Sequence, residues 1–296
     1  MDIMEKLRYR LEYIFYKINS KKKPIVFSYY LSVVAIIKNE ADYIAEWLEY
    51  HLLVGVRKFY IFDNDSKDNL VGVLKPYITA GIVEYHYIFG IRKQRYVYNH
   101  ILEKARKETF WLAVIDCDEF IVPITTRTIN ELLVGFEEFS GVEINWVIYG
   151  SNGEKVKAEG LVMERFKSHS LPEFERNRVV KSIVNPRRVY NVHVHDCIYF
   201  KNNYSVNTNK ERNKEYFLYR NGVFDKIRIN HYFGKSYEEF LLKRNRGRAS
   251  KIGLKPIEDF YKFDRNEIVN DPIMDKYIKI VYENIKKRYN VFENKL

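Results

Sequence analysis

The stretch that decides the fold is LSVVAIIKNEADYIAEWLEYHLLVGVRKFYIFDNDS, residues 31–66. It begins with a mostly apolar run, residues 31–37, whose β-branched side chains predict a buried strand. Residues 41–53 follow, with apolar side chains recurring on one face at helical spacing. Residues 59–62 are a second short apolar run. The order strand, helix, strand predicts a parallel βαβ unit.

The same alternation continues downstream and extends the sheet. It predicts a helix over 70–80, a strand over 82–88, a helix over 93–107 and a strand over 111–115. Short apolar strands separated by helices are typical of a doubly wound, mainly parallel α/β sheet that is covered on both faces.

After Pro123 the pattern changes to longer loops and isolated strands. We expect helices over 130–139, from 237 and over 271–289, with Ser236 and Glu239 as a capping box, and strands over 141–149, 179–184, 189–194 and 224–230. The predicted organisation is an N-terminal helix (1–28), two halves of one core domain (29–125 and 126–250) and a C-terminal helical extension (251–296).

The composition is that of an ordinary globular chain of 296 residues, with 46% hydrophobic and 30% charged residues. Its two cysteines, Cys117 and Cys197, form no CxxC pair or disulfide framework, which indicates a reducing compartment. We see no secretory signal and no apolar run approaching the ~20 residues of a membrane span. We therefore expect a cytoplasmic protein, soluble or peripheral on the inner face of the membrane.

The formal net charge of +11 favours anionic partners. Nucleotide diphosphates, nucleic acid and an anionic membrane surface all fit this charge. The N-terminal residues are relevant to the anionic membrane surface. Their apolar side chains lie near one face of a helix, and Lys21-Lys22-Lys23 follows. This pattern fits a helix on a membrane surface or one packed on the domain.

Polar and acidic residues follow each of the first four predicted strands. In doubly wound sheets, ligands bind beyond the carboxyl ends of the strands. The segments at this edge are Lys38-Asn39-Glu40, Asp63-Asn64-Asp65-Ser66, Phe89-Gly90 and Asp116-Cys117-Asp118-Glu119.

Asp116-x-Asp118 is the sharpest motif at this edge. Two carboxylates at the end of a buried strand can hold a divalent cation that neutralises a diphosphate leaving group. An oxygen-rich site accepts either Mn²⁺ or Mg²⁺, so we expect one of these two ions there.

The other polar residues at this edge have two interpretations each. Asp63 and Asp65 can accept hydrogen bonds from a nucleoside, or they can form Asx-turns. Lys38 and Asn39 can hold phosphate or base, and Glu40 can bind or simply begin the next helix. Farther along, Arg92, Lys93 and Arg95 can meet diphosphate oxygens or form a solvated face. His193 and His195, two apart on a predicted strand, are expected to face the same side.

The combined motifs resemble glycosyltransferase family 92 and related family 2-like enzymes over residues 31–250. The matching blocks are Lys38-Asn39-Glu40, Phe62-Asp63-Asn64-Asp65-Ser66, Gln94 with Tyr98-Asn99, Asp116-Cys117-Asp118-Glu119, Asn145-Trp146, Tyr149-Gly150-Ser151-Asn152-Gly153, Lys181-Ser182-Ile183 and Asn230-His231-Tyr232.

The resemblance implies a GT-A fold, a nucleotide-sugar donor, a divalent metal and inversion at the anomeric carbon. It implies that residues 29–125 are the nucleotide-sugar-binding half and residues 126–250 the acceptor-binding half. It implies that Asp116 and Asp118 bind the metal with His231 nearby, and that Asp63 or Asp65, Gln94 and Asn99 contribute to donor binding. UDP-galactose is the first donor it suggests. It also suggests a glycan or lipid-linked acceptor in bacterial surface polysaccharide or lipopolysaccharide synthesis.

Inversion needs a general base near the acceptor hydroxyl. The sequence does not single it out. The acids that follow the metal motif, in the expected acceptor half, are Glu164, Glu173, Glu175 and Asp196. We take Glu164 and Asp196 as catalytic candidates.

Other functions fit parts of the sequence. A nucleotidyltransferase would use the same sheet but usually has a Gly-rich basic loop after the first strand. A nucleic-acid-binding protein would explain the basic cluster 243–248, which we interpret instead as a solvated or membrane-facing helix end. A glycosidase would space its carboxylates about 5–10 Å apart across a cleft. A sugar-binding module would leave the strand-end acids unexplained. We expect no nucleic-acid partner.

Overall fold

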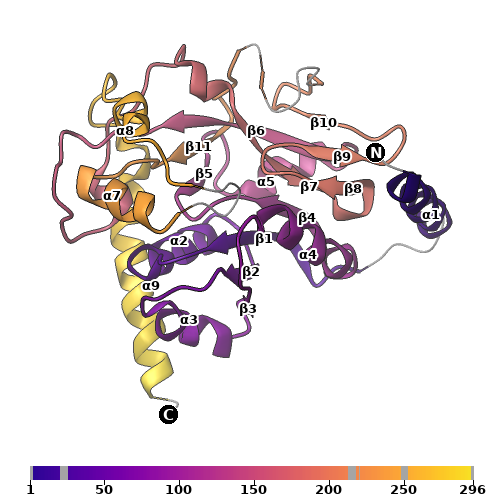
Figure 1. Cartoon of the computed structure of the whole chain (residues 1–296), viewed down its shortest axis with the longest axis horizontal. Helices are drawn as coiled ribbons and strands as arrows, with labels where there is room; N and C mark the ends of the chain where they lie inside the picture. The colour runs from indigo at the N-terminus through magenta and orange to yellow at the C-terminus, as the bar shows by residue number, and fades with distance from the viewer. Residues whose placement is uncertain (1–2, 21–25, 213–217, 220, 248–252, 295–296) are drawn as a thin grey trace.

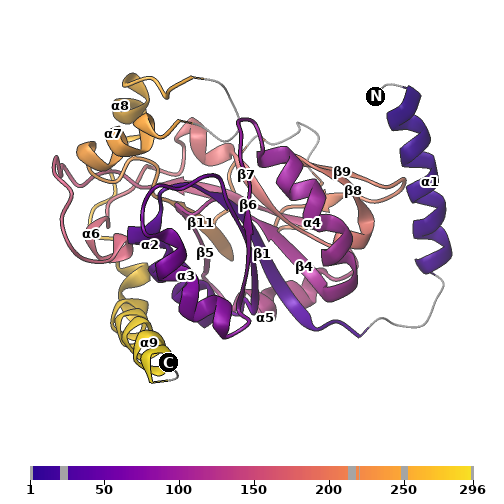
Figure 2. The same ribbon diagram turned by 60° about the horizontal axis from the view of Figure 1, so that its bottom comes forward.

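The computed structural model describes residues 3–20, 26–212, 218–219, 221–247 and 253–294. The first half has the predicted alternation of strands and helices (Figures 1 and 2). Its elements are β1 (Tyr29–Ile37), α2 (Ala41–Leu53), β2 (Lys58–Asp63), α3 (Leu70–Thr79), β3 (Val83–Tyr87), α4 (Gln94–Glu108) and β4 (Thr109–Val114). β1 pairs in parallel with both β2 and β4, and β2 with β3.

Both faces of this sheet are covered, because alternate residues of each strand point to opposite sides. Val33 and Ala35 of β1 belong to the large core with α2 and α3. Val34 and Ile36 belong to a second core with α4. The uninterrupted apolar run of β1 is thus the pattern of a strand buried on both faces.

The second half continues the same sheet. Its elements are β5 (Glu119–Pro123), α5 (Ile129–Leu133), η1 (Val134–Phe136), β6 (Gly141–Ile148), α6 (Val162–Arg165), η2 (Glu175–Arg178), β7 (Val180–Val184), η3 (Pro186–Arg188), β8 (Val189–Val192), β9 (Cys197–Tyr199), β10 (Ser205–Val206) and β11 (Ile227–His231). The strand order is β3-β2-β1-β4-β7-β6-β11-β5, with β10 beside β6 and a separate β8-β9 pair. The sheet is mostly parallel, and the α/β, GT-A-type fold class is confirmed.

Two expectations about this half are wrong, and one strand was missed. The helix predicted over 130–139 is only α5 followed by the short η1. β5 was not predicted as a strand at all. The strand predicted over 189–194 ends at Val192, so His193 and His195 lie in the turn after it and do not share a strand face.

The C-terminal elements are α7 (Tyr237–Asn245), α8 (Glu258–Phe263), η4 (Pro272–Met274) and α9 (Asp275–Glu293). The predicted capping box is present: Ser236 accepts the Glu239 N–H, and Glu239 accepts the Ser236 N–H. Phe233, Phe240 and Phe260 form a small core that holds α7 and α8 together.

α9 packs against α2 and α3 of the first half. The rings of Tyr50 and Tyr277 are 5.1 Å apart, Arg288 Nε lies 3.0 Å from Glu49 Oε1, and the Tyr289 hydroxyl donates to Val73 O. The last segment is therefore part of the main core. α1 (Ile3–Ser20) stands at the opposite edge of the molecule (Figure 2). In the part of the chain described here, no helix is long and apolar enough to cross a bilayer.

Candidate active site

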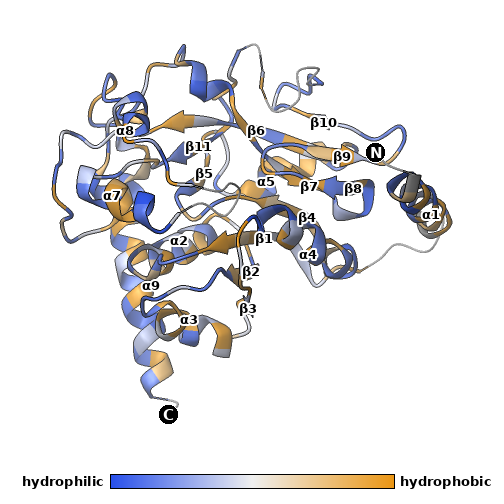
Figure 3. Cartoon of the chain, in the orientation of Figure 1, coloured by the Kyte–Doolittle hydropathy of each residue, from blue (hydrophilic) through white to orange (hydrophobic). Residues whose placement is uncertain are grey.

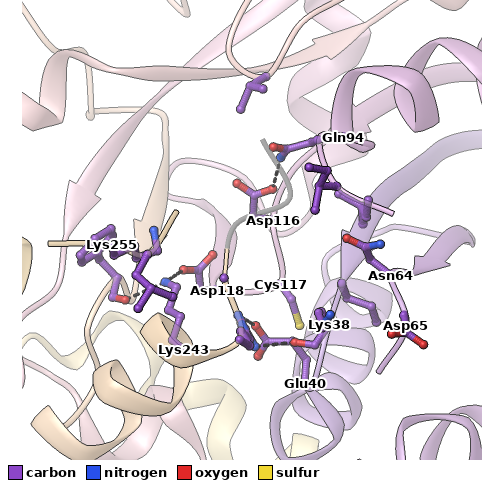
Figure 4. Close-up of a pocket in the computed structure, with 18 of the residues that line it drawn as sticks. Lys38, Glu40, Asn64, Asp65, Gln94, Asp116, Cys117, Asp118, Lys243 and Lys255 are labelled. Carbon is purple, nitrogen blue, oxygen red and sulfur yellow. Dashed lines mark hydrogen bonds and ion pairs between the residues drawn. The ribbon is translucent and has the colours of Figure 1, made fainter. Parts of the chain in front are cut away.

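A pocket of about 540 Å³ opens at the carboxyl ends of β1, β2 and β4. This volume suits a ligand of cofactor size. The predicted site residues on its wall are Lys38, Glu40, Asp65, Gln94, Asp116, Asp118 and His231. Asn64, Cys117, Lys243 and Lys255 also line it, as Figure 4 shows.

Asp116 is held by three side-chain donors. Lys181 Nζ, from β7, lies 2.8 Å from Oδ2, while Gln94 Nε2 and the Tyr98 hydroxyl donate to Oδ1 at 3.0 and 3.3 Å. Burial opposes ionisation of Asp116, but the adjacent Lys181 ammonium outweighs it and the pKa of Asp116 is lowered. Asp116 is therefore a positioned carboxylate whose oxygens already have protein partners.

Lys181 links Asp116 to a second, deeper acid. Its Nζ lies 3.6 Å from Glu119 Oε2, and that carboxyl also accepts the Asp116 backbone N–H at 2.9 Å. Burial raises the pKa of Glu119 well above its usual value. Glu119 thus braces the turn that carries the two aspartates and does not line the pocket.

Asp118 faces different partners from Asp116, although only Cys117 separates them. Its Oδ2 is ion-paired with Lys243 of α7 and lies 3.4 Å from His231 Nε2 at the end of β11. Burial opposes ionisation, but Lys243 and His231 outweigh it, and the pKa of Asp118 is well below its usual value. Figure 4 shows Asp116 beside Gln94 and Asp118 beside Lys243.

The basic cluster at the end of α7 is turned inward, contrary to the solvated or membrane-facing helix end that the sequence suggested. Lys243 also donates to Phe233 O at 2.7 Å. Arg246 pairs with Glu40 and donates to the carbonyls of Lys38 and Asn39. The side chains of Lys243 and Arg246 are only 11% and 17% exposed. Position 248 lies outside the described residues.

The two acids after β2 have separate roles in the structure. Asp63 is buried, accepting the Ser66 N–H at 2.9 Å and the Tyr85 hydroxyl at 2.8 Å. Asp65 adopts a positive φ of 60°, contacts Lys67 and Tyr87, and lines the pocket. Of these two acids, Asp65 is the one that a ligand in the pocket can reach.

Several predicted site residues do not line the pocket. Asn39 accepts the Lys67 N–H, and Asn99 binds the backbone of Val192 on β8. Glu164 accepts the Tyr282 hydroxyl, and Asp196 pairs with His193. Arg92, at a positive φ of 57°, is also absent from the pocket wall. Glu164 and Asp196, the two candidate bases, are therefore not among the residues that line the pocket with Asp116 and Asp118.

Trp146 lines the pocket, although no role was expected for it. Its ring centroid lies 4.3 Å from that of His231 and 5.2 Å from that of His195. Its buried Nε1 has no hydrogen-bond partner among the described residues. A ring that packs against two pocket histidines can serve as a wall for a sugar. Only the resemblance motif Asn145-Trp146 pointed to it.

The fit to a divalent cation is best at Asp118 and His231. His231 Nε2 and Asp118 Oδ2 face each other at 3.4 Å, so one cation could contact both. Burial lowers the pKa of His231, which favours the neutral, metal-binding ring. No cluster of three or more His, Cys, Asp or Glu ligands occurs among the described residues. Mg²⁺ and Mn²⁺ need few protein ligands when phosphate and water supply the rest.

The fold and the site together define a class: an α/β protein with a pocket at the carboxyl edge of its sheet, where ligands of such sheets bind, lined by acids and cations. The chain belongs to glycosyltransferase family 92, whose family model matches residues 30–260.

The curated relatives are plant proteins. A glycosyltransferase family 92 protein of Oryza sativa subsp. japonica is 24% identical over 168 residues, which cover 55% of this chain and 29% of the relative. The galactan beta-1,4-galactosyltransferase GALS3 of Arabidopsis thaliana is 25% identical over 194 residues, covering 60% of this chain and 38% of the relative. The chain thus spans about a third of the length of these relatives.

Among solved structures, the chain is similar to S. aureus TarS 1-349 in complex with UDP. The TM-score is 0.36 and the identity 15%, over 53% of this chain and 47% of that one. A similarity this low carries no argument about the ligand of this chain.

Proposed function

We propose that this chain transfers a hexose, with galactose as the first candidate, from a UDP-sugar to a hydroxyl group of a glycan or lipid-linked acceptor, with inversion. The observation that carries the proposal is the pocket at the end of β4, where Asp116 and Asp118 face buried lysines. Family membership supports the reaction class. The galactosyltransferase names of two Arabidopsis thaliana relatives support galactose and a glycan acceptor.

The residues around the pocket suit a diphosphate. Lys38, Lys243, Arg246 and Lys255 line it, and cations held in a partly dry cleft stabilise the charge that develops on a leaving diphosphate. Asp65 and Asn64, at the end of β2, are placed to accept or donate hydrogen bonds to a nucleoside. We assign the nucleoside to the β1–β2 side and the diphosphate to the side of α7.

Asp118 and His231 are the residues that would hold Mn²⁺ or Mg²⁺, which supplies Lewis-acid stabilisation of the diphosphate when bound. Asp116 would act through its network with Lys181 and Gln94, keeping the turn that carries Asp118 in place.

The pathway stays a prediction. The relatives are plant proteins and lend no support to synthesis of a bacterial surface polysaccharide or lipopolysaccharide. The expected work at the inner face of a cell membrane likewise stays a prediction.

The test is donor binding and hydrolysis on a panel of UDP-, GDP-, CMP- and dTDP-sugars, each with Mn²⁺ and with EDTA. We expect metal-dependent UDP release from one sugar, reduced at least about a hundredfold in Asp118→Asn because a charge-stabilising group at the leaving diphosphate is lost. Glu138→Gln, an exposed acid paired with Lys210, is the matched control and should behave like wild type.

Two outcomes would contradict the proposal. The first is binding of no nucleotide sugar in the presence of metal, which would return a nucleic-acid-binding protein to first place. The second is equal activity of Asp118→Asn and Glu138→Gln, which would place the chemistry elsewhere. Release that is unchanged by EDTA would overturn the metal part alone.

A further inference from the structure

α1 is attached to the rest of the protein through one face only. The Tyr9 ring lies 4.9 Å from the Tyr190 ring at a near-perpendicular angle, and Tyr13 lies 6.2 Å from Phe200. Arg106 reaches Glu12 at 3.5 Å. These contacts come from the β8-β9 region and α4, and they fix which side of the helix faces outward.

The outward side of α1 carries an apolar stripe. Its residues are Met4, Leu7, Leu11, Ile14, Phe15 and Ile18, each between 52% and 73% exposed. At 3.6 residues per turn they fall within an arc of about 100°. The views in Figures 2 and 3 place α1 at the edge of the molecule with no element beyond it. In the described part of the chain, nothing covers this stripe.

Most of the charges that border the stripe are positive. Helical spacing puts Lys6, Arg10 and Lys17 along one border and Arg8 along the other, and all four are exposed. The acidic Glu5 and Glu12 lie between Arg8 and the anchoring tyrosines, and Glu12 pairs with both Arg8 and Arg106. In the sequence, three further lysines follow the helix directly.

We propose that α1 docks this protein on an anionic membrane surface, with the stripe in the boundary between headgroups and acyl chains and the basic borders on the lipid phosphates. An apolar face with basic borders is complementary to such a surface in both depth and charge. A second copy is a poorer occupant, because antiparallel stripe-on-stripe packing would bring the borders with Lys6, Arg10 and Lys17 together, and parallel packing would set this border against Arg8. The inference does not depend on the proposed donor.

The test is co-sedimentation of the full chain with vesicles of phosphatidylcholine, with and without phosphatidylglycerol. We expect binding to the anionic vesicles that weakens as salt is raised. Leu11→Asp and Phe15→Asp should each reduce partitioning about tenfold or more, because each puts a charge in the apolar face. The matched control, Val71→Asp, changes an exposed apolar residue on α3 and should bind like wild type.

The basic borders are tested by Arg10→Glu with Lys17→Glu, against Lys279→Glu on α9, which is 88% exposed. The border variant should lose its preference for anionic vesicles, while the control should keep it. UDP release in solution, without vesicles, should be unchanged in every α1 variant, so failure of docking and failure of the donor proposal are read separately.

Three results would overturn the inference. One is no binding to anionic vesicles, and another is equal binding by Phe15→Asp and wild type with circular dichroism showing both folded. The third is a dimer, seen by light scattering, that Phe15→Asp dissociates, because the stripe would then bind a second copy.

Discussion

At the scale of single residues, Lys181 has the most demanding position in the site. Its side chain is 1% exposed and lies within 4 Å of two acids, Asp116 and Glu119. Removing one partner of a buried ion pair leaves the remaining charge without compensation. We expect Lys181→Met to lower the free energy of unfolding by about 3–5 kcal/mol, measured by urea denaturation.

The control for Lys181 is Lys104→Met on α4. Lys104 also contacts two acids, Glu84 and Glu108, but its side chain is 42% exposed. Solvent-exposed pairs contribute less than about 1 kcal/mol. Similar losses in the two variants would show that Lys181 is not part of a desolvated network.

His51 gives the fold a dependence on pH. It is fully buried, with Nδ1 on Trp47 O and Nε2 accepting the Ile121 N–H, and burial lowers its pKa to about 3. The unfolded chain binds a proton below about 6.5 and the folded chain does not until about 3. The contribution of His51 is therefore complete above pH 6.5 and is lost as pH falls, by about 1.4 kcal/mol per unit.

The measurement is the free energy of unfolding across this pH window for wild type and His51→Gln. We expect the difference between the two proteins to shrink as the pH falls from 6.5 towards 3, because the variant lacks the titrating ring. A difference that stays constant with pH would contradict this assignment.

The site was predictable only where its signal is local. Asp116 and Asp118 stand directly after a buried apolar run, so the sequence predicted their place at the edge of the sheet, where the structure has them. Their partners do not share this property: Lys181 is 65 residues from Asp116, and Lys243 is 125 residues from Asp118. When only the fold brings two side chains together, their separation in the sequence follows no pattern, and the sequence does not predict the contact.

At the scale of elements, the loop after β6 packs directly on the loop after α8. A Cβ on Gly150 would lie 2.4 Å from the Arg265 carbonyl and 2.3 Å from Asn266 Oδ1. Because one of these contacts is backbone, we expect Gly150→Ala to destabilise the protein by about 1–3 kcal/mol, as overpacking does. Gly135→Ala, with open space around its Cβ, should be neutral or stabilising. Thermal unfolding would compare them, and equal midpoints would contradict the close packing.

The elements with regular apolar patterns were predicted well, and the exceptions have physical reasons. α2 spans the predicted residues 41–53, because its apolar side chains recur at helical spacing over that range. β5 has only five residues, follows the Asp116–Asp118 turn at once, and pairs with β11 across the far edge of the sheet. No turn signal separates β5 from its neighbours, and its partner β11 is distant in the sequence, so local pattern does not predict this strand. The β8 strand stops at Val192 because the chain turns back to pair with β9.

At the scale of the whole molecule, the two ends of the described chain differ in how much they contribute to the stability of the core. Met274, Tyr277 and Val281 of η4 and α9 are in the main core, and Asp271 pairs with the buried Arg228. We expect removal of residues 271–296 to abolish cooperative unfolding, and removal of residues 1–28 to leave it intact. Circular dichroism on heating would show this. A cooperative transition in the first variant would mean that α9 only covers the core.

The packing of α9 on α2 also bears on how the protein is made. α2 ends at Leu53 and α9 begins at Asp275, so a ribosome adds more than two hundred residues between them. At roughly 5–20 residues per second this takes on the order of ten to forty seconds. Throughout that interval the apolar face of the nascent α2–α3 layer is without its cover. Folding is therefore completed late in synthesis or after release, and a chaperone that shields this face would raise the yield of active protein.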